Sequence, residues 1–376
     1  MALSKVDLAN QVENQLPQSL VADNVNFRNI IINGDMSIAQ RGTSATGLGN
    51  GDNGYHTVDR WKFNESGTPT FEFTMTQDTD VPSGQGFSKS MKLACTTSQA
   101  SLATDDNLRF LTIIEGQNLQ YLKYGTSNAE STTLSFWIKS NKTGDYSVAL
   151  YNADTVDIIT RTITINSADT WEKKTLTFAG DTGNAFNNDN GVSLYLWITL
   201  LAGTDYNTSS AVNWTSYSTG KLAYGQTVNL ADSTSNYINI TGVQLEAGTA
   251  ASDFEFLPYD VNLRRCQRYY YLHAKQGGSF EPIGLVIYYS NSNIQCYISF
   301  QTSMRADPSL EVGSGTNYYR IDRNNGSNLM NSFGLNISFT TGAIIYNSTE
   351  ASGTAGQSGI TYTNNGSAYV AFDSEL

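Results

Sequence analysis

Apolar and polar residues alternate along most of the chain between Phe27 and Pro258. In the stretch TTLSFWIK, Leu134, Phe136 and Ile138 fall on one face of an extended strand and the polar residues fall mostly on the other. Loops rich in Gly, Asn, Asp and Ser separate such runs, and no helical pattern lies between them. This spacing predicts a large β-sandwich rather than a βαβ fold. The predicted strands span residues 132–139, 146–150, 160–165, 171–178, 192–200 and 237–245.

A second series of strands follows Pro258. A short basic segment, residues 262–268, reads as a helical connector, and strands are predicted at 283–289, 294–301, 318–323, 335–339, 343–346 and 368–372. A unit of roughly 110 residues buries only a modest share of its surface on its own. We therefore expect the last hundred or so residues to share their core with sister copies around a threefold axis.

The first 28 residues carry a different pattern. Leu8, Val12, Leu16 and Leu20 recur at steps of four and share one face of a helix, which Pro17 interrupts. A short helix of this kind needs a partner surface. We interpret the segment as an arm that docks on, or trimerises within, a larger assembly, with a frayed terminus as the alternative. The predicted docking residues are Leu3, Val6, Leu8 and Val12.

Composition narrows the class of protein. Of 376 residues, 39% are hydrophobic, which is below the usual share for a globular chain, but 11% are aromatic, which argues against a disordered chain. The net charge of −12 argues against a nucleic-acid binder. No apolar run approaches the ~20 residues of a membrane helix, and residues 1–5 do not read as the start of a signal peptide. Three widely spaced cysteines indicate neither a disulfide framework nor a zinc motif, so we expect folding in a reducing cytoplasm.

Several motifs, taken in order, resemble those of phage tail-fibre and virion-fibre proteins. The first is NIIINGDMSIAQRG, and LPYDVNLRRCQRYY spans the point after Pro258 where the composition changes. The matching segments are residues 29–42, Tyr55 with 59–61, 114–116, 134–140, 170–182, 240–248, 257–270 and the terminal FDSEL at 372–376.

This resemblance implies a trimeric virion structural protein with an all-β fold. The implied domains are a virion-docking arm (1–28), a jelly-roll sandwich similar to carbohydrate-binding modules (29–257), a connector (258–275) and a C-terminal β domain (276–376). The implied partners are other copies of the chain, tail or capsid proteins, and host surface polysaccharide or lipopolysaccharide. The expected location is the virion. The alternatives are a capsid decoration protein without ligand, and a glycan-active enzyme or its binding module.

Aromatic residues in polar loops are the candidates for sugar binding, because aromatic faces can stack on pyranose rings and loops carry recognition. One group lies in residues 203–225, where Trp214 has packing as its alternative role. A second group lies in two tyrosine pairs of the C-terminal unit, in which neighbours must point to opposite faces. We expect Trp137, Trp171 and Trp197 to pack within strands. The predicted sugar-binding residues are Tyr206, Trp214, Tyr217, Tyr224, Tyr288 and Tyr318.

Catalytic and metal-binding patterns are weak. Glu115, Glu130, Glu172 and Glu246 lie on separate predicted elements, and His56 and His273 read as surface residues, so we expect no enzyme. We expect no cofactor, although the oxygen-rich loop 181–191 offers Asp181 and Asp189 as calcium ligands, with an ordinary turn as the alternative.

Arginines near the connector stand out in so acidic a chain. Arginine pairs well with carboxylates, so we expect intersubunit ion pairs there rather than phosphate contacts, with solvated charges as the alternative. The predicted trimer contacts are Arg264, Arg268 and Tyr270.

Overall fold

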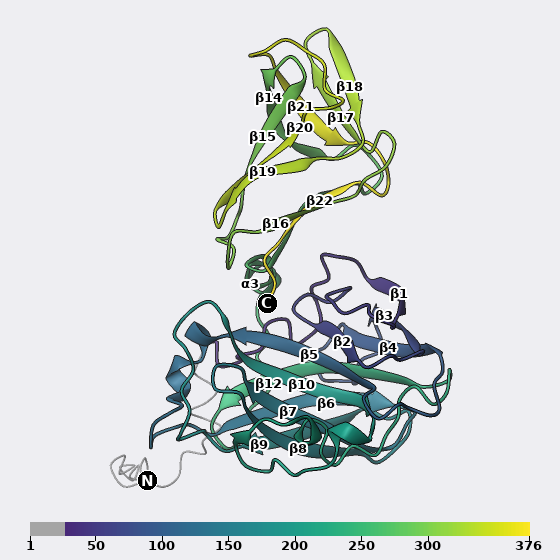
Figure 1. Ribbon diagram of the computed structural model, residues 1–376, viewed down its shortest axis with the longest axis vertical. Coiled ribbons are helices and arrows are strands. Elements are labelled where there is room, and N and C mark those ends of the chain that lie inside the picture. The colour runs from purple at the N-terminus through teal and green to yellow at the C-terminus, as the bar shows by residue number, and fades with distance from the viewer. Residues whose placement is uncertain (1–26) are drawn as a thin grey trace, which may run out of the picture. The chain divides into compact units, whose positions relative to one another are not determined.

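The computed structural model describes residues 27–376, which form two compact units that divide between Leu257 and Pro258 (Figure 1). The regular secondary structure of each unit is almost all antiparallel strand, as the alternating pattern predicts. The predicted all-β sandwich followed by a smaller β unit is confirmed. The predicted docking residues Leu3, Val6, Leu8 and Val12 lie outside the described residues.

The first unit is a sandwich of two six-stranded antiparallel sheets. The strand order in sheet A is β1 (Ser44–Leu48), β3 (Glu72–Asp78), β4 (Ser90–Thr97), β12 (Tyr237–Ala247), β6 (Thr132–Ser140) and β9 (Glu172–Phe178). The order in sheet B is β11 (Thr215–Ser216), β8 (Asp157–Ile165), β7 (Gly144–Asn152), β10 (Val192–Ala202), β5 (Asn107–Glu115) and β2 (Lys62–Ser66). Short 3-10 turns at Gly116–Asn118, Gln120–Leu122, Thr204–Tyr206 and Thr219–Lys221 interrupt the loops.

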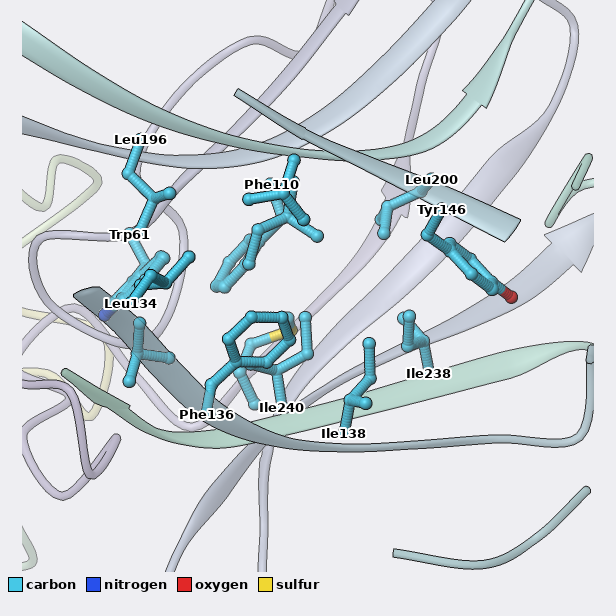
Figure 2. Close-up of a cluster of buried hydrophobic side chains, with 14 of the residues drawn as sticks. Trp61, Phe110, Leu134, Phe136, Ile138, Tyr146, Leu196, Leu200, Ile238 and Ile240 are labelled. Atoms are coloured by element: carbon cyan, nitrogen blue, oxygen red, sulfur yellow. The ribbon is translucent and has the colours of Figure 1, made fainter. Parts of the chain in front are cut away.

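The sandwich core forms because strand residues alternate between the two faces of each sheet. Leu134, Phe136 and Ile138 of β6 are fully buried and meet Phe110 and Leu196 from sheet B (Figure 2). Each such side chain contributes about 1.5–3 kcal/mol by leaving water. The sandwich therefore has a continuous apolar interior of its own.

Asn33, within the first motif, ties the start of the sandwich together. Its amide oxygen accepts a hydrogen bond from the Ile38 amide (3.0 Å), and its amide nitrogen donates to the carbonyls of Ile38 and Asp59 (2.9 Å each). Trp61 donates its indole N–H to the Asn33 carbonyl (3.1 Å). The backbone of Asn33 is left-handed (φ 58°), a conformation that asparagine tolerates better than most residues.

Other residues of the same motif hold this segment against β12. Asn29 donates to the Val243 carbonyl and accepts from the amides of Ile31 and Leu245. Gly34 packs so closely that a Cβ atom would overlap the Val243 carbonyl, which excludes any larger residue. The residues that carry the resemblance in this segment are therefore structural.

The second unit contains one helix and two antiparallel sheets. The helix is α3 (Tyr259–Gln267), and the three-stranded sheet has the order β13 (Tyr270–Lys275), β22 (Tyr369–Asp373) and β16 (Ser309–Val312). The seven-stranded sheet has the order β18 (Gly326–Met330), β17 (Tyr319–Arg323), β21 (Ser358–Thr363), β14 (Pro282–Ser290), β15 (Asn293–Ser299), β20 (Gly342–Asn347) and β19 (Gly334–Phe339).

Two expectations about this unit need correction. Residues 258–275 are not a separate connector, because β13 pairs with β22 inside the unit. The unit also has a core of its own: Tyr288, Ile298, Tyr319 and Phe372 are buried together between the sheets. The alternating strands supply enough inward-facing apolar residues, so this interior is filled within one chain.

All three cysteines are free and buried. Burial raises the pKa of Cys95 to about 11 and that of Cys296 to about 12. Both thiols are therefore protonated and unreactive at neutral pH. Among the described residues, no helix combines the length and apolarity needed to cross a membrane.

His273 is half-buried on β13 rather than on the surface as expected, and its Nε2 lies 2.7 Å from the Ile283 carbonyl. Burial lowers the pKa of His273 below 6.5, although the hydrogen bond to Ile283 opposes this. The folded unit therefore binds a proton less readily than the unfolded chain, and its stability is full above pH 6.5 and falls as the pH drops below that value.

We expect His273→Gln to reduce this loss between pH 6.5 and pH 5, because glutamine cannot take up the proton. Amide hydrogen exchange of β13 and β14, followed against pH, measures the effect. His56→Gln, in the sandwich, is the control. An identical pH dependence in His273→Gln and the unmodified chain would contradict the prediction.

Candidate functional site

The outer face of sheet B carries aromatic residues where an exposed strand face is usually polar. In β10, Leu194, Leu196 and Ile198 point into the core, so Tyr195 and Trp197 point outward. Tyr195 lies opposite Tyr151 of β7, and Trp197 lies opposite Leu111 of β5. Strand pairing thus gathers aromatic residues that are far apart in sequence.

These residues line a cleft of about 330 Å³. Trp197 forms its floor and is only 5% exposed. The Tyr151 ring stacks on the indole at 4.7 Å between centroids, and the Arg109 guanidinium also lies over it at 5.0 Å. The indole faces are thus covered by neighbours. The full lining is Lys62, Asn64, Arg109, Leu111, Tyr151, Tyr195, Trp197 and Tyr217.

Tyr217 reaches the cleft from the loop at residues 203–225. The two-residue strand β11 pairs with β8, and the Tyr217 amide donates to the Val156 carbonyl (2.8 Å). Thr160 of β8 fixes the same loop, because its amide donates to the Ala211 carbonyl (2.7 Å). The loop therefore covers part of the outer face of sheet B and leaves the cleft open beside Tyr217.

The half-buried tyrosines Tyr151, Tyr195 and Tyr217 supply both ring faces and hydroxyl groups. Burial raises the pKa of Tyr151 and of Tyr195, so both hydroxyls stay protonated and can donate hydrogen bonds. Tyr217 meets Tyr151 edge to face at 5.3 Å. A flat, partly apolar ligand with hydroxyl groups matches this surface.

Of the four sugar-binding residues predicted in loop 203–225, only Tyr217 lies in the cleft. Tyr206 is buried, and its hydroxyl contacts Ser66 Oγ (2.8 Å) and the Asp105 carbonyl (3.0 Å). Trp214 donates to the Ala179 carbonyl (2.7 Å) and packs against the sandwich core, in agreement with its alternative role. Tyr224 is exposed but does not line the cleft.

Of the two C-terminal tyrosines predicted to bind sugar, Tyr288 is fully buried and its hydroxyl donates to Asn328 Oδ1, so its ring cannot stack on a sugar. Its neighbour Tyr289 is the exposed member of that pair, as alternation requires. Tyr318 is half-buried and packs against the core of the C-terminal unit.

Sequence reasoning missed Tyr151, Tyr195 and Arg109, and it assigned Trp197 to packing. The packing assignment agrees with its burial, yet this side chain is also the floor of the cleft. The sequence of β10 contained one indication of the site. Leu194 and Leu196 alternate with Tyr195 and Trp197, so the two aromatic residues are expected on the face opposite the core.

The predicted calcium ligands serve the loop itself. Asp181 accepts hydrogen bonds from the amides of Gly183 and Asn184, and Asp189 accepts from the amide of Gly191. Such contacts are typical of Asx turns. Among residues 27–376, no group of three or more His, Cys, Asp or Glu side chains could hold a metal ion.

The four glutamates considered for catalysis stay apart from the cleft lining. Glu115 and Glu246 are buried and hydrogen-bonded to Gln117 and Ser252, respectively, and Glu130 pairs with Lys123. Burial opposes ionisation of Glu172, but hydrogen bonds from Lys174 and two backbone amides lower its pKa to about 2. A glutamate with so low a pKa does not act as a general acid at neutral pH.

The predicted trimer contacts differ in exposure. Tyr270 is only 2% exposed within its own chain, so its side chain is not available to a second copy. This burial disagrees with the predicted trimer contact at Tyr270, although its neighbour Tyr271, and not Tyr270, belongs to the apolar core of the C-terminal unit. Arg264 is exposed and Arg268 is half-buried.

The seven-stranded sheet of the C-terminal unit has an exposed apolar face. Leu285 is 75% exposed and lies opposite Ile360, which places apolar groups side by side on β14 and β21. Isolated surface hydrophobics are ordinary, but contiguous ones mark interaction sites. We call this set the apolar face: Leu285, Ile287, Tyr289, Tyr297, Leu329, Ile337, Phe339 and Ile360.

No family model and no curated protein matches this chain. Among solved structures, it is similar to the enzymatically active domain of bacteriophage CBA120 tailspike protein 4, with 14% identity and a TM-score of 0.33. That match covers 59% of this chain and 22% of the tailspike chain. It is also similar to a family 11 carbohydrate-binding module from Clostridium thermocellum in complex with a β-1,3-1,4-mixed-linked tetrasaccharide (10% identity, TM-score 0.26, 56% and 98% coverage). Similarity at this level assigns neither a family nor a function.

Proposed function

We propose that this chain is a glycan-binding subunit of a bacteriophage virion fibre. The observation that carries the glycan-binding proposal is the cleft on sheet B, where Tyr151, Tyr195 and Tyr217 surround the buried Trp197. Sugars present flat apolar ring faces edged by hydroxyls, and aromatic rings with polar tips match both features. The volume of about 330 Å³ lies within the range of small-ligand sites.

The virion part of the proposal rests on the resemblance of the ordered sequence motifs to phage fibre proteins. In this proposal residues 1–28 fasten the chain to a tail or capsid protein, and the cleft recognises host polysaccharide or lipopolysaccharide. Weak binding at each cleft suffices when several copies act together. Labelling the assembled particle with an antibody against the C-terminal unit tests the location, and absence of label from purified virions would contradict it.

We propose binding without catalysis. Hydrolysis of a glycosidic bond ordinarily requires two carboxylates flanking the bond, and none of the eight residues that line the cleft is Asp or Glu. Incubation of the purified chain with the glycans it binds, followed by product analysis, tests this point. Turnover of any of them would favour the enzyme alternative.

A glycan array tests the binding function itself. We expect the purified chain to bind a restricted set of bacterial surface glycans. Silence across the array, together with location on the phage head, would favour the alternative of a decoration protein without ligand.

We also propose that the chain forms homotrimers through the apolar face of the C-terminal unit. Arg320 lies opposite Leu329 and Asp322 lies opposite Ile360, and these two charged side chains pair with each other (2.6 Å). Because the charges of this pair cancel, the apolar face can meet the same face of another copy without the repulsion that a net charge of −12 otherwise creates. The occupant is therefore a second and third copy of the same chain.

Changing Leu285 and Ile287 together to aspartate is expected to convert trimers to monomers, because six carboxylates would be buried in one trimer. Sedimentation equilibrium measures the mass. Both side chains are exposed, so the fold of one chain is retained. Changing the exposed Val156 and Val212 of the sandwich to aspartate is the control, and a monomeric unmodified chain would contradict the proposal.

A further inference from the structure

The cleft contains two cationic side chains and no anionic one. Lys62 and Arg109 line it, together with tyrosines, a tryptophan, a leucine and an asparagine. This is unexpected in a chain with 34 acidic and only 22 basic residues. The local charge of the cleft is thus opposite to that of the whole chain.

Arg109 has no counter-ion. Within the part of the chain that the structure describes, its guanidinium forms no ion pair and no hydrogen bond, and its Nε is buried without an acceptor. The groups near it are the Trp197 ring and the hydroxyls of Tyr195, Tyr206 and Tyr217. Arg109 is half-buried, and a partly desolvated cation without a counter-ion is costly, so the site gains free energy when an anion binds.

Lys62 is placed to act with Arg109. The β2–β5 pairing sets Lys62 opposite Leu111 and Asn64 opposite Arg109, so the two cations lie on adjacent strands of one sheet face. The Lys62 ammonium lies 5.6 Å from the Tyr55 ring centroid, and no ion pair to it occurs among the described residues. Both positive charges therefore remain available to a ligand.

We propose that the cleft selects acidic glycans, in which a pyranose ring carries a carboxylate. The proposal rests on the glycan-binding function above and adds the charge of the ligand. The tyrosine rings contact the sugar ring, and the planar guanidinium of Arg109 receives the carboxylate through two parallel N–H donors. Lys62 contributes a second, less directional charge.

The test compares matched oligosaccharides that differ only in charge. Trisaccharides of galacturonic, glucuronic and mannuronic acid are titrated into the full chain by calorimetry, beside their methyl esters and the corresponding neutral trisaccharides. A sulfated trisaccharide distinguishes a carboxylate site from one that accepts any anion. We expect at least one uronate to bind about tenfold or more tightly than its ester, with a preference that weakens as salt rises.

The variant Arg109→Met tests whether Arg109 causes the preference for uronates over their methyl esters. Methionine keeps most of the side-chain volume but removes the charge, so the uronate and its ester should then bind within about twofold of each other. Lys173→Met, at an exposed position on β9 in the other sheet, is the charge-matched control and should retain the preference.

The outcomes separate the two proposals. Equal binding of uronates and esters, or an unchanged preference in Arg109→Met, overturns the acidic-ligand inference while glycan binding stands. Tighter binding of the sulfated sugar than of every uronate overturns the carboxylate assignment. Failure of every charged and neutral trisaccharide to bind overturns both proposals.

Discussion

Alanine at both Tyr151 and Tyr217 is expected to weaken glycan binding by about a hundredfold or more. The two rings meet edge to face at 5.3 Å and come from different segments, β7 and loop 203–225. Loss of a central aromatic contact typically costs a binding site about 2 kcal/mol or more. Removing Tyr151 alone uncovers the Trp197 ring, which can then contact the sugar, so the double variant is the sharper test.

Calorimetry with the glycan that binds most tightly on the array measures this effect. Tyr224→Ala is the matched control, because Tyr224 belongs to the same loop and is exposed outside the cleft. It should bind as the unmodified chain does. Unchanged affinity in the double variant, with the strand content intact by circular dichroism, would falsify the location of the site.

The second large effect is expected on stability. Asn33→Ala removes a side chain that satisfies one amide and two carbonyls, all in a buried region. Each buried polar group left without a partner costs about 1–3 kcal/mol, and alanine at a left-handed position (φ 58°) adds about 1 kcal/mol. We expect the sandwich to lose about 3–5 kcal/mol of unfolding free energy or to fail to fold.

Denaturant unfolding followed by tryptophan fluorescence reports on this unit, since all five tryptophans lie between residues 61 and 214. Asn33→Gly separates the two contributions, because glycine adopts the backbone conformation without strain but cannot make the hydrogen bonds. Asn50→Ala is the control, since Asn50 is exposed and also left-handed (φ 51°). Equal destabilisation by Asn33→Ala and Asn50→Ala would contradict the structural role of the side chain.

The sequence predicted strands best where apolar residues alternate strictly. The prediction for residues 132–139 matches β6, and that for 237–245 matches β12, each within about two residues. No strand was assigned between residues 44 and 115, where β1 to β5 lie. In β5, Ile113 and Ile114 are both buried, because loops also cover the outer face of the sheet. A strand that is buried on both faces does not show an alternation of apolar and polar residues.

The candidate site was harder to predict, because it depends on which strands pair. Tyr217 was accessible to sequence reasoning as an aromatic in a polar loop. Arg109, Tyr151 and Trp197 become neighbours only when β5, β10 and β7 pair in this order, and periodicity along one strand contains no such information. Tyr206 and Trp214 have the same local sequence character as Tyr217, and only the folded loop distinguishes them.

The prediction that the C-terminal unit lacks an adequate apolar core of its own was also wrong. Its short strands do fill an interior, in which Tyr288 and Tyr319 are completely buried. The apolar excess lies instead on the outer surface of the seven-stranded sheet, at residues such as Leu285 and Tyr297. The alternation of apolar and polar residues shows which residues share a face of a strand. It does not show which of the two faces of the sheet packs against a second sheet.

The cleft is lined partly by the strands of sheet B and partly by a loop. Seven of its eight lining residues belong to hydrogen-bonded strands, and Tyr217 alone comes from the loop at residues 203–225. Insertions or substitutions in that loop can therefore alter which ligands fit without disturbing the interior of the sandwich. Specificity can diversify quickly at one wall while the cationic wall and the tryptophan floor stay constant.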